Sequence, residues 1–236
     1  MKILALDSSG LVASVAVVED EKLLAEYTVN YKKTHSQTLL PMLDEIGKMI
    51  DLDLSAIDAI AVAAGPGSFT GLRIGSATAK GLGLALDKPL IAVPTVDALA
   101  YNLYGTDKLV CPIMDARRNQ VYNALFHVSR GNCQRIREDR AISLADLGEE
   151  LKNLEEPIFL VGDGSILCYN TLLENVPGLV LPPEHRMHQR AAGVALEGWR
   201  MAKEGRTVSG QELVPNYLRL SQAERERLER QNNGKV

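Results

Sequence analysis

The sequence has few cysteines, no long uncharged apolar run and no excess of positive charge. Its three cysteines, Cys111, Cys133 and Cys168, are scattered and odd in number. This suits a reducing compartment and excludes a paired-cysteine metal site. No stretch of about 20 uncharged apolar residues occurs, so we expect no membrane span. The opening MKILALDSSG places Asp7 where a signal peptide needs apolar residues. We therefore expect no signal peptide and a cytoplasmic protein.

Acidic residues outnumber basic ones: the 236 residues include 30 aspartates and glutamates and 26 lysines and arginines. The resulting formal net charge of −4 argues against autonomous, tight binding of nucleic acid, which needs a basic footprint. A chain of this length is expected to form one or two domains with a substantial core.

Histidines are also scarce, at positions 35, 127, 185 and 188. His185 and His188 are spaced for one face of a helix, but they lie in PPEHRMHQR, which we expect to be a solvated loop. A protein metal site needs three or four convergent ligands, and the sequence contains no H-E-x-x-H motif. We therefore expect no metal site, and a metalloprotease is disfavoured.

The hydrophobic pattern predicts the same order of elements twice. In the first half, strands are expected at 3–6, 12–18 and 23–29, then a helix at 36–50, a strand at 57–64, a helix at 71–86 and a strand at 90–93. In the second half, strands are expected at 109–114, 121–128 and 134–142, then a helix at 144–154, a strand at 158–161 and a helix after residue 165. Asp7 and Asp115 each close the first strand of their half. This order indicates a duplicated α/β protein, with domains over 1–104 and 105–236 and a charged tail at 222–231.

The stretch AAGPGSFTGLRIG at 63–75 connects a strand to a helix through a glycine-rich loop. The phosphate-loop template G-x-x-x-x-G-K-[ST] fails here, because no Gly-Lys-Ser/Thr triplet follows. Ser68 or Thr70 is expected to cap the helix that begins at this loop. A tight turn between strand and helix is favoured over a phosphate loop.

Small residues form a stripe along the helix at 71–86, since Gly71, Gly75, Ala79 and Gly83 recur at intervals of four. A glycine inside a helix costs about 1 kcal/mol relative to alanine, so the stripe indicates close approach of another backbone. The apolar arc is wider than the roughly 100° that one sheet requires. A second cover is therefore expected, either from a neighbouring helix of the same domain or, as we favour, from a partner subunit.

The predicted partner interface combines this helix with the apolar face of the helix at 36–50. Its residues are Leu39, Met42, Leu43, Ile46, Gly71, Leu72, Gly75, Ala79, Leu82 and Gly83. If the stripe faces its own domain instead, the interface falls on the opposite flank or on the helix at 36–50. That flank contains Ile74, Ala77, Gly81 and Ala85.

Six stretches resemble one family along nearly the whole chain: ALDSSG, HSQTLLPMLDEI, GPGSFTGLRIG, TAKGLGLAL, VPTVDALA and PNYLR. They are similar to TsaB (YeaZ), the dimerisation subunit of the bacterial tRNA threonylcarbamoyladenosine machinery. The element order resembles the actin, Hsp70 and sugar-kinase superfamily. That resemblance implies two facing ribonuclease H-like domains that clamp a nucleotide, with the second domain reduced. The positions it places beside a nucleotide are Asp7, Ser8, Ser9, Asp115, Gly162 and Gly164.

The resemblance implies a non-catalytic subunit that binds TsaD, which transfers threonylcarbamoyl to the adenosine beside the anticodon. It also implies TsaE as a partner, tRNA contact through the complex and a possible homodimer in isolation. TsaD has a His-x-x-x-His metal pair, whereas the comparable VPTVDALAYNL has no histidine. No cofactor is expected for this chain alone, while ATP and magnesium are expected in the assembled complex. The alternative is an ATP-dependent phosphotransferase or ATPase, in which Asp7 and Asp115 hold magnesium through water.

Overall fold

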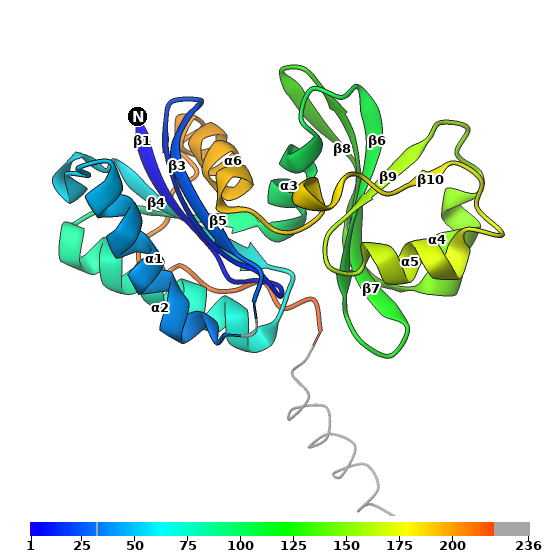
Figure 1. Ribbon diagram of the computed structural model, residues 1–236, viewed down its shortest axis with the longest axis horizontal. Coiled ribbons are helices and arrows are strands. Elements are labelled where there is room, and N and C mark those ends of the chain that lie inside the picture. The colour runs from blue at the N-terminus through cyan, green and yellow to red at the C-terminus, as the bar shows by residue number, and fades with distance from the viewer. Residues whose placement is uncertain (32, 220–236) are drawn as a thin grey trace, which may run out of the picture.

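The computed structural model describes residues 1–31 and 33–219, which form two five-stranded mixed sheets side by side (Figure 1). The first sheet has the order β3-β2-β1-β4-β5, with β1 (Lys2–Asp7), β2 (Ala13–Glu19), β3 (Lys22–Val29), β4 (Ala59–Gly65) and β5 (Leu90–Pro94). The second has the order β10-β9-β6-β7-β8, with β6 (Lys108–Asp115), β7 (Gln120–Ser129), β8 (Asn132–Ser143), β9 (Ile158–Val161) and β10 (Leu179–Val180). In each sheet the first strand pairs antiparallel with the second strand of its half and parallel with the fourth. The duplicated α/β order predicted from the sequence is confirmed.

Helices cover both faces of the first sheet, which explains why β1 and β4 are almost wholly apolar. Helices α1 (His35–Met49) and α2 (Phe69–Leu86) pack on the face that carries Leu4, Leu6 and Val62. Helix α6 (Ala191–Lys203) packs on the opposite face. Because successive side chains of a strand point to opposite faces of the sheet, each strand contributes residues to two separate cores. A short 3-10 turn, η1 (Leu54–Ala56), precedes β4.

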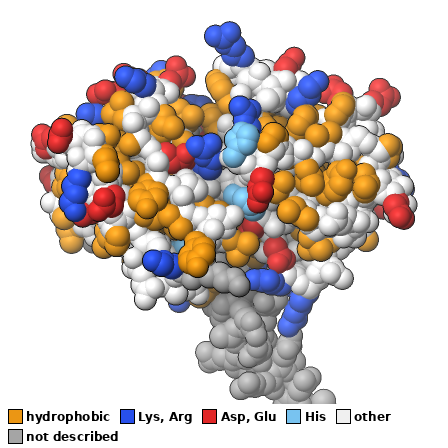
Figure 2. Space-filling model, in the orientation of Figure 1, with side chains coloured by type: hydrophobic (Ala, Val, Ile, Leu, Met, Phe, Trp, Pro, Cys, Tyr) orange, Lys and Arg blue, Asp and Glu red, His pale blue; other side chains and the backbone are white. Residues whose placement is uncertain are grey.

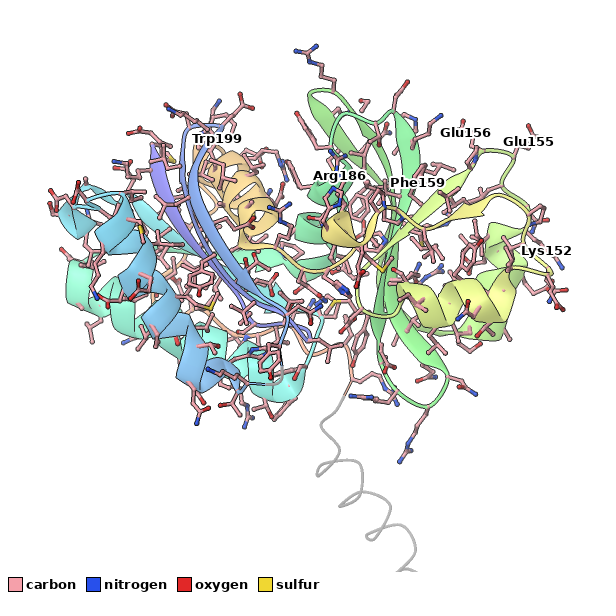
Figure 3. The ribbon with its side chains drawn as sticks, in the orientation of Figure 1. Lys152, Glu155, Glu156, Phe159, Arg186 and Trp199 are labelled. Carbon is pink, nitrogen blue, oxygen red and sulfur yellow. The ribbon has the colours of Figure 1, made fainter. Side chains whose placement is uncertain are left out.

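The second sheet is sandwiched in the same way. Helices α4 (Leu144–Leu151) and α5 (Ser165–Leu172) cover its outer face, and α3 (Thr95–Ala100) with η2 (Tyr101–Leu103) covers the face toward the first domain. In Figure 3, Lys152, Glu155 and Glu156 mark the outer edge of this domain, far from α3. The junction therefore uses a helix from the first half of the chain to complete the core of the second domain.

The predicted domain boundary needs a correction, because the chain returns to the first domain after η3 (Glu184–Arg186). Residues Ala191, Val194 and Met201 of α6 lie in one core with Ile3 and Ala5 of β1. The first domain therefore contains a C-terminal segment that 105–236 had assigned to the second. The charged run expected at 222–231 lies outside the described residues.

The segment PPEHRMHQR is the crossing between the domains, and the expectation of a solvated loop holds for residues 183–186, which are exposed, but not for the rest of it. Met187 and Gln189 are buried. The backbone carbonyls of Met187 and His188 accept hydrogen bonds from Gly162 N (2.5 Å) and Asn102 Nδ2 (2.7 Å) respectively. Its prolines and charges suggested exposure throughout, but the part from Met187 onward passes between the two domains and is covered there.

The stretch after α6, residues 208–219, is termed here the C-terminal strap. It pairs with the free edge of β5, where Leu90 N donates to Val208 O at 2.9 Å. Leu213 is fully buried in the α1–α2 core, and Asn216 N donates to Ala64 O at 2.7 Å. These contacts lead the strap along the first domain to the junction of the two sheets.

Candidate functional site

A cleft of about 400 Å³ lies between the domains, at the ends of β1 and β6. Its walls come from the turn after β1, the start of α2, the end of β6, the turn after β9 and the strap. The residues that line it are 9–11, 67–70, 114–117, 122, 163 and 216–219. Of the six positions expected beside a nucleotide, Ser9 and Asp115 line this cleft, whereas Asp7, Ser8, Gly162 and Gly164 lie behind its walls.

Polar groups of the turn after β1 form hydrogen bonds within the turn and to the start of α2. Oδ1 of Asp7 accepts hydrogen bonds from Ser9 N (2.9 Å) and Ser9 Oγ (2.7 Å), and Ser8 Oγ donates to Gly71 O (2.9 Å). The two serine hydroxyls and the Ser9 amide of this turn are therefore occupied within the protein. Burial raises the pKa of Asp7 to about 6, and the bonds from Ser9 oppose that shift.

The glycine loop lies directly on this turn, which explains its glycines. Ser68 N donates to Ser9 O at 2.7 Å. A Cβ at Gly67 would lie 2.5 Å from Ser9 O, and a Cβ at Gly71 would lie 1.9 Å from Ser8 O. Ser68 also caps α2 by accepting from Gly71 N at 3.3 Å, so one of the two expected caps is confirmed. The glycines allow a backbone-to-backbone contact that any side chain would block.

The small-residue stripe of α2 faces the chain's own sheet, so its expected role in a partner contact is corrected. A Cβ at Gly75 would meet Ser8 Oγ at 2.6 Å, and one at Gly83 would meet Leu90 Cδ2 at 2.6 Å. Ala79 is 0 % exposed. The other named residues are also covered: Leu39, Met42, Leu43, Ile46, Gly71 and Leu72 are buried, and Leu82 is half-buried. The sheet is the first cover of α2, and α1 of the same domain provides the second cover that the helical wheel required.

The exposed arc of α2 is the opposite flank. Ala77, Gly81 and Ala85 are exposed there, whereas Ile74 is half-buried. Leu84 is 87 % exposed, and a Cβ at Gly81 would have nothing within 4 Å. Of the four positions that the sequence offered as the alternative interface, Ala77, Gly81 and Ala85 are therefore open to solvent, whereas Ile74 packs against the chain's own core.

The second domain brings two carboxylates to the cleft. Asp115 Oδ1 accepts from Arg117 N at 2.7 Å, and Oδ2 lies 3.3 Å from Arg117 Nη1. Asp163 Oδ1 accepts from Asp115 N at 3.3 Å, and burial raises the pKa of Asp163. A Cβ at Gly162 would lie 2.3 Å from Ile113 O. The turn after β9 therefore packs on β6, with a glycine where the backbones touch.

Within residues 1–31 and 33–219, no group of three or more His, Cys, Asp or Glu side chains is placed to hold a metal ion. His35 Nε2 instead lies 2.9 Å from the carbonyl oxygen of Gly10. No helix in this part of the chain is both long and apolar enough to span a membrane.

Sequence reasoning missed an aromatic and cationic cluster at the mouth of the cleft. The rings of Phe69 and Tyr217 lie 4.7 Å apart. The guanidinium of Arg73 lies 4.0 Å from the Phe69 ring centroid, and its Nε donates to Tyr217 Oη at 3.3 Å. Arg219 Nη1 donates to Ala116 O at 2.7 Å, which ties the strap to the second domain. The motif PNYLR, which contains Tyr217 and Arg219, was the only signal in the sequence for this cluster. The motif gives no indication that these two residues contact Phe69, Arg73 and Ala116.

A family model described as "TsaD: tRNA N6-adenosine threonylcarbamoyltransferase" matches residues 22–226. The TsaB protein of Bacillus subtilis (strain 168), named a tRNA threonylcarbamoyladenosine biosynthesis protein, is 36% identical over 233 residues, which cover 98% of this chain and 100% of the relative. The chain belongs to the TsaB family. By the match to residues 22–226 it also belongs to the wider family that the TsaD model describes.

Solved structures agree with this membership of the TsaB (YeaZ) family. YeaZ from Pseudomonas aeruginosa has a TM-score of 0.74 at 27% identity, over 92% of this chain and 99% of that one. The ROK hexokinase from Thermus thermophilus has a TM-score of 0.51 at 13% identity, over 86% and 100%. The likeness to the hexokinase shows the fold alone. The predicted actin-like, sugar-kinase-like fold class is therefore confirmed.

Proposed function

We propose that this chain is a non-catalytic subunit of tRNA threonylcarbamoyladenosine synthesis, which binds TsaD and supports its transfer of threonylcarbamoyl to the adenosine beside the anticodon. The observation that carries the proposal is the likeness to TsaB proteins along nearly the whole chain. TsaE as a further partner, tRNA contact through the complex and a cytoplasmic location are parts of the same proposal. ATP and magnesium belong, on this proposal, to the assembled complex.

The cleft supports a non-catalytic role. In the turn after β1, Ser9 donates to Asp7 and Ser8 Oγ donates to Gly71 O, and the carboxylate of Asp115 is paired with Arg117. A phosphotransferase would have to break these contacts to place a phosphate and a metal ion in the cleft. The free energy of those rearrangements opposes binding.

The exposed flank of α2 is the surface that we propose for TsaD. Small residues such as Ala77 and Gly81 permit close approach of another helix, and Leu84 provides apolar area at the same flank. The neighbouring α1 adds Leu40 and Met49, which are 53 % and 80 % exposed. In Figure 1, α1 and α2 lie next to each other on the outer side of the first domain. A homodimer of the isolated chain would compete for the same surface.

Calorimetric titration with purified TsaD tests this proposal. The wild-type chain is expected to bind, and Ala77→Arg is expected to weaken binding strongly while leaving the thermal melt unchanged. Arg137→Gln, on the exposed part of β8 in the other domain, serves as the control and should bind as the wild type does. Unchanged affinity of Ala77→Arg would place the TsaD contact elsewhere.

The second candidate is a phosphotransferase or ATPase, which the hexokinase-like fold and the carboxylates at the ends of β1 and β6 favour. A coupled assay of the isolated chain with ATP and magnesium separates the two candidates. The subunit proposal expects no turnover, whereas turnover that Asp115→Ala abolishes would support the phosphotransferase.

A further inference from the structure

The β6–β7 hairpin holds two arginines in an unfavourable backbone conformation. Arg117, Arg118 and Asn119 have φ values of 65°, 56° and 55°, all in the left-handed region. Glycine adopts this region freely, whereas in other residues the side chain crowds the backbone and makes it unfavourable. The hairpin is nevertheless firmly held, since Ala116 N donates to Gln120 O (3.0 Å) and Leu144 N donates to Asn119 O (3.1 Å). Arginine thus stands twice where glycine would cost less, which points to a use for the guanidinium groups.

Two more arginines reach the same mouth of the cleft from other elements. Arg73 comes from the start of α2 and Arg219 from the strap, and Arg219 bonds to Ala116 O beside the hairpin. We call Arg73, Arg117, Arg118 and Arg219 the basic rim. Figure 2 shows several Lys and Arg side chains along the lower edge of the molecule, below the junction of the domains, and others along the upper edge.

Acidic and aromatic groups complete the rim. Asp115 pairs with Arg117 at 3.3 Å and offsets part of its charge, while Asp163 is half-buried and also lines the cleft. Arg118 is exposed. Tyr217 is 38 % exposed beside Phe69, so an aromatic surface lies among the cations.

Guanidinium groups bind phosphate oxygens through several N–H donors, and aromatic rings stack with nucleobases. An acidic protein surface would also pair with the cations, whereas stacking on an exposed ring is the contact that a nucleobase adds. We propose that the basic rim contacts the phosphate backbone of single-stranded RNA and that a base packs against Tyr217. This inference rests on the proposed role in tRNA modification and names the part of the chain that meets the RNA. Because four cations reach only a few phosphates, the contact is weak and strongly salt-dependent.

Fluorescence anisotropy tests the rim. The full-length chain is titrated into a labelled single-stranded RNA of about 12 nucleotides, and the affinity is measured at several salt concentrations between about 50 and 200 mM. The double variant Arg117→Gln/Arg118→Gln is expected to bind about tenfold more weakly. The slope of log affinity against log salt should fall by about 1.4, because each lost single-strand phosphate contact contributes about 0.7. The single variant Arg118→Gln should lose about half of that slope, and it keeps the test valid if the double variant fails to fold.

The matched control is Arg130→Gln/Arg137→Gln, two exposed arginines of the same domain that do not line the cleft. It should bind RNA as the wild type does. Equal losses in both double variants, or no binding of RNA by the wild type at about 50 mM salt, would overturn the inference. So would displacement of the RNA by a small excess of ATP, because the rim would then serve a free nucleotide.

The TsaD titration separates this inference from the proposed function. Both arginine double variants should bind TsaD with unchanged affinity. If Arg117→Gln/Arg118→Gln weakens TsaD binding and leaves RNA binding intact, the rim is a protein contact and the RNA inference fails, while the subunit proposal stands. If TsaD does not bind the wild-type chain, the subunit proposal fails, and the anisotropy comparison still decides the RNA contact.

Discussion

Two glycines of α2 allow the same substitution to be made with opposite expected results. Gly71 lies where the helix touches the turn after β1, and Gly81 lies on the exposed arc. Replacing either with alanine removes the same backbone freedom and adds the same methyl group. Only the surroundings of that methyl group differ, so the pair isolates the contact between α2 and the turn.

At Gly71 the new Cβ would lie 1.9 Å from Ser8 O, a backbone atom that cannot rotate away. The turn or the helix must shift, which also disturbs the 2.9 Å bond from Ser8 Oγ to Gly71 O. Overpacking of this kind costs about 1–3 kcal/mol and outweighs the helix-propensity gain of alanine, which is at most about 1 kcal/mol. With a lost hydrogen bond of about 1 kcal/mol added, Gly71→Ala should lower the free energy of unfolding by about 2–3 kcal/mol.

At Gly81 nothing lies within 4 Å of the new Cβ, so only the propensity gain remains. Gly81→Ala should raise the free energy of unfolding by about 0.5–1 kcal/mol. For a chain of this size, Gly71→Ala should lower the melting midpoint by roughly 5–10 °C, whereas Gly81→Ala should raise it by about 2–3 °C. Thermal melts followed by circular dichroism measure both. A stabilising effect of alanine at both positions would refute the packing of α2 on the turn.

Three further predictions follow from the same contacts. Ala79→Arg forces a charge into the core and should leave the chain unfolded or insoluble. Ala77→Arg should melt like the wild type. Its binding to TsaD, measured by calorimetry, should weaken by about 4 kcal/mol, which corresponds to a dissociation constant raised roughly a thousandfold. The folded-state pKa of Asp7, about 6 against an ordinary 3.8, means that its stabilising contribution is present below pH 4 and is lost as pH rises through 6. Asp7→Asn should therefore be more stable than the wild type above pH 6, by at most about 3 kcal/mol, with the difference shrinking toward pH 4 in urea titrations. Asp115→Ala should leave the yield of modified nucleoside in the assembled complex nearly unchanged, whereas a phosphotransferase would lose orders of magnitude.

Most elements could be predicted from the sequence, because strands such as β1 and β4 are short apolar runs with clear boundaries. The ends of β1 and β6 at Asp7 and Asp115 were placed in the same way. Helix α6 was not assigned, although its apolar residues recur with helical spacing. The sheet that it covers comes from the start of the chain, and no local pattern indicates that contact.

The face that α2 buries could not be decided from a helical wheel. A wheel shows which residues share an arc, but small residues occupy both arcs of this helix, and only the position of the sheet distinguishes them. The cleft residues contributed by the strap were also beyond sequence reasoning. The contact between Tyr217 and Phe69 joins residues that are distant in the chain, and no local pattern specifies such a pair.

Reconstituted synthesis of the modified nucleoside tests the central claim most directly. Purified chain, TsaD and TsaE are combined with ATP, magnesium, threonylcarbamoyl-adenylate and tRNA, each protein is omitted in turn, and the nucleosides are quantified by mass spectrometry. The subunit account predicts product from the complete mixture, little or none when this chain is omitted, and none from this chain alone. Product from this chain without TsaD, or full yield without this chain, would contradict it.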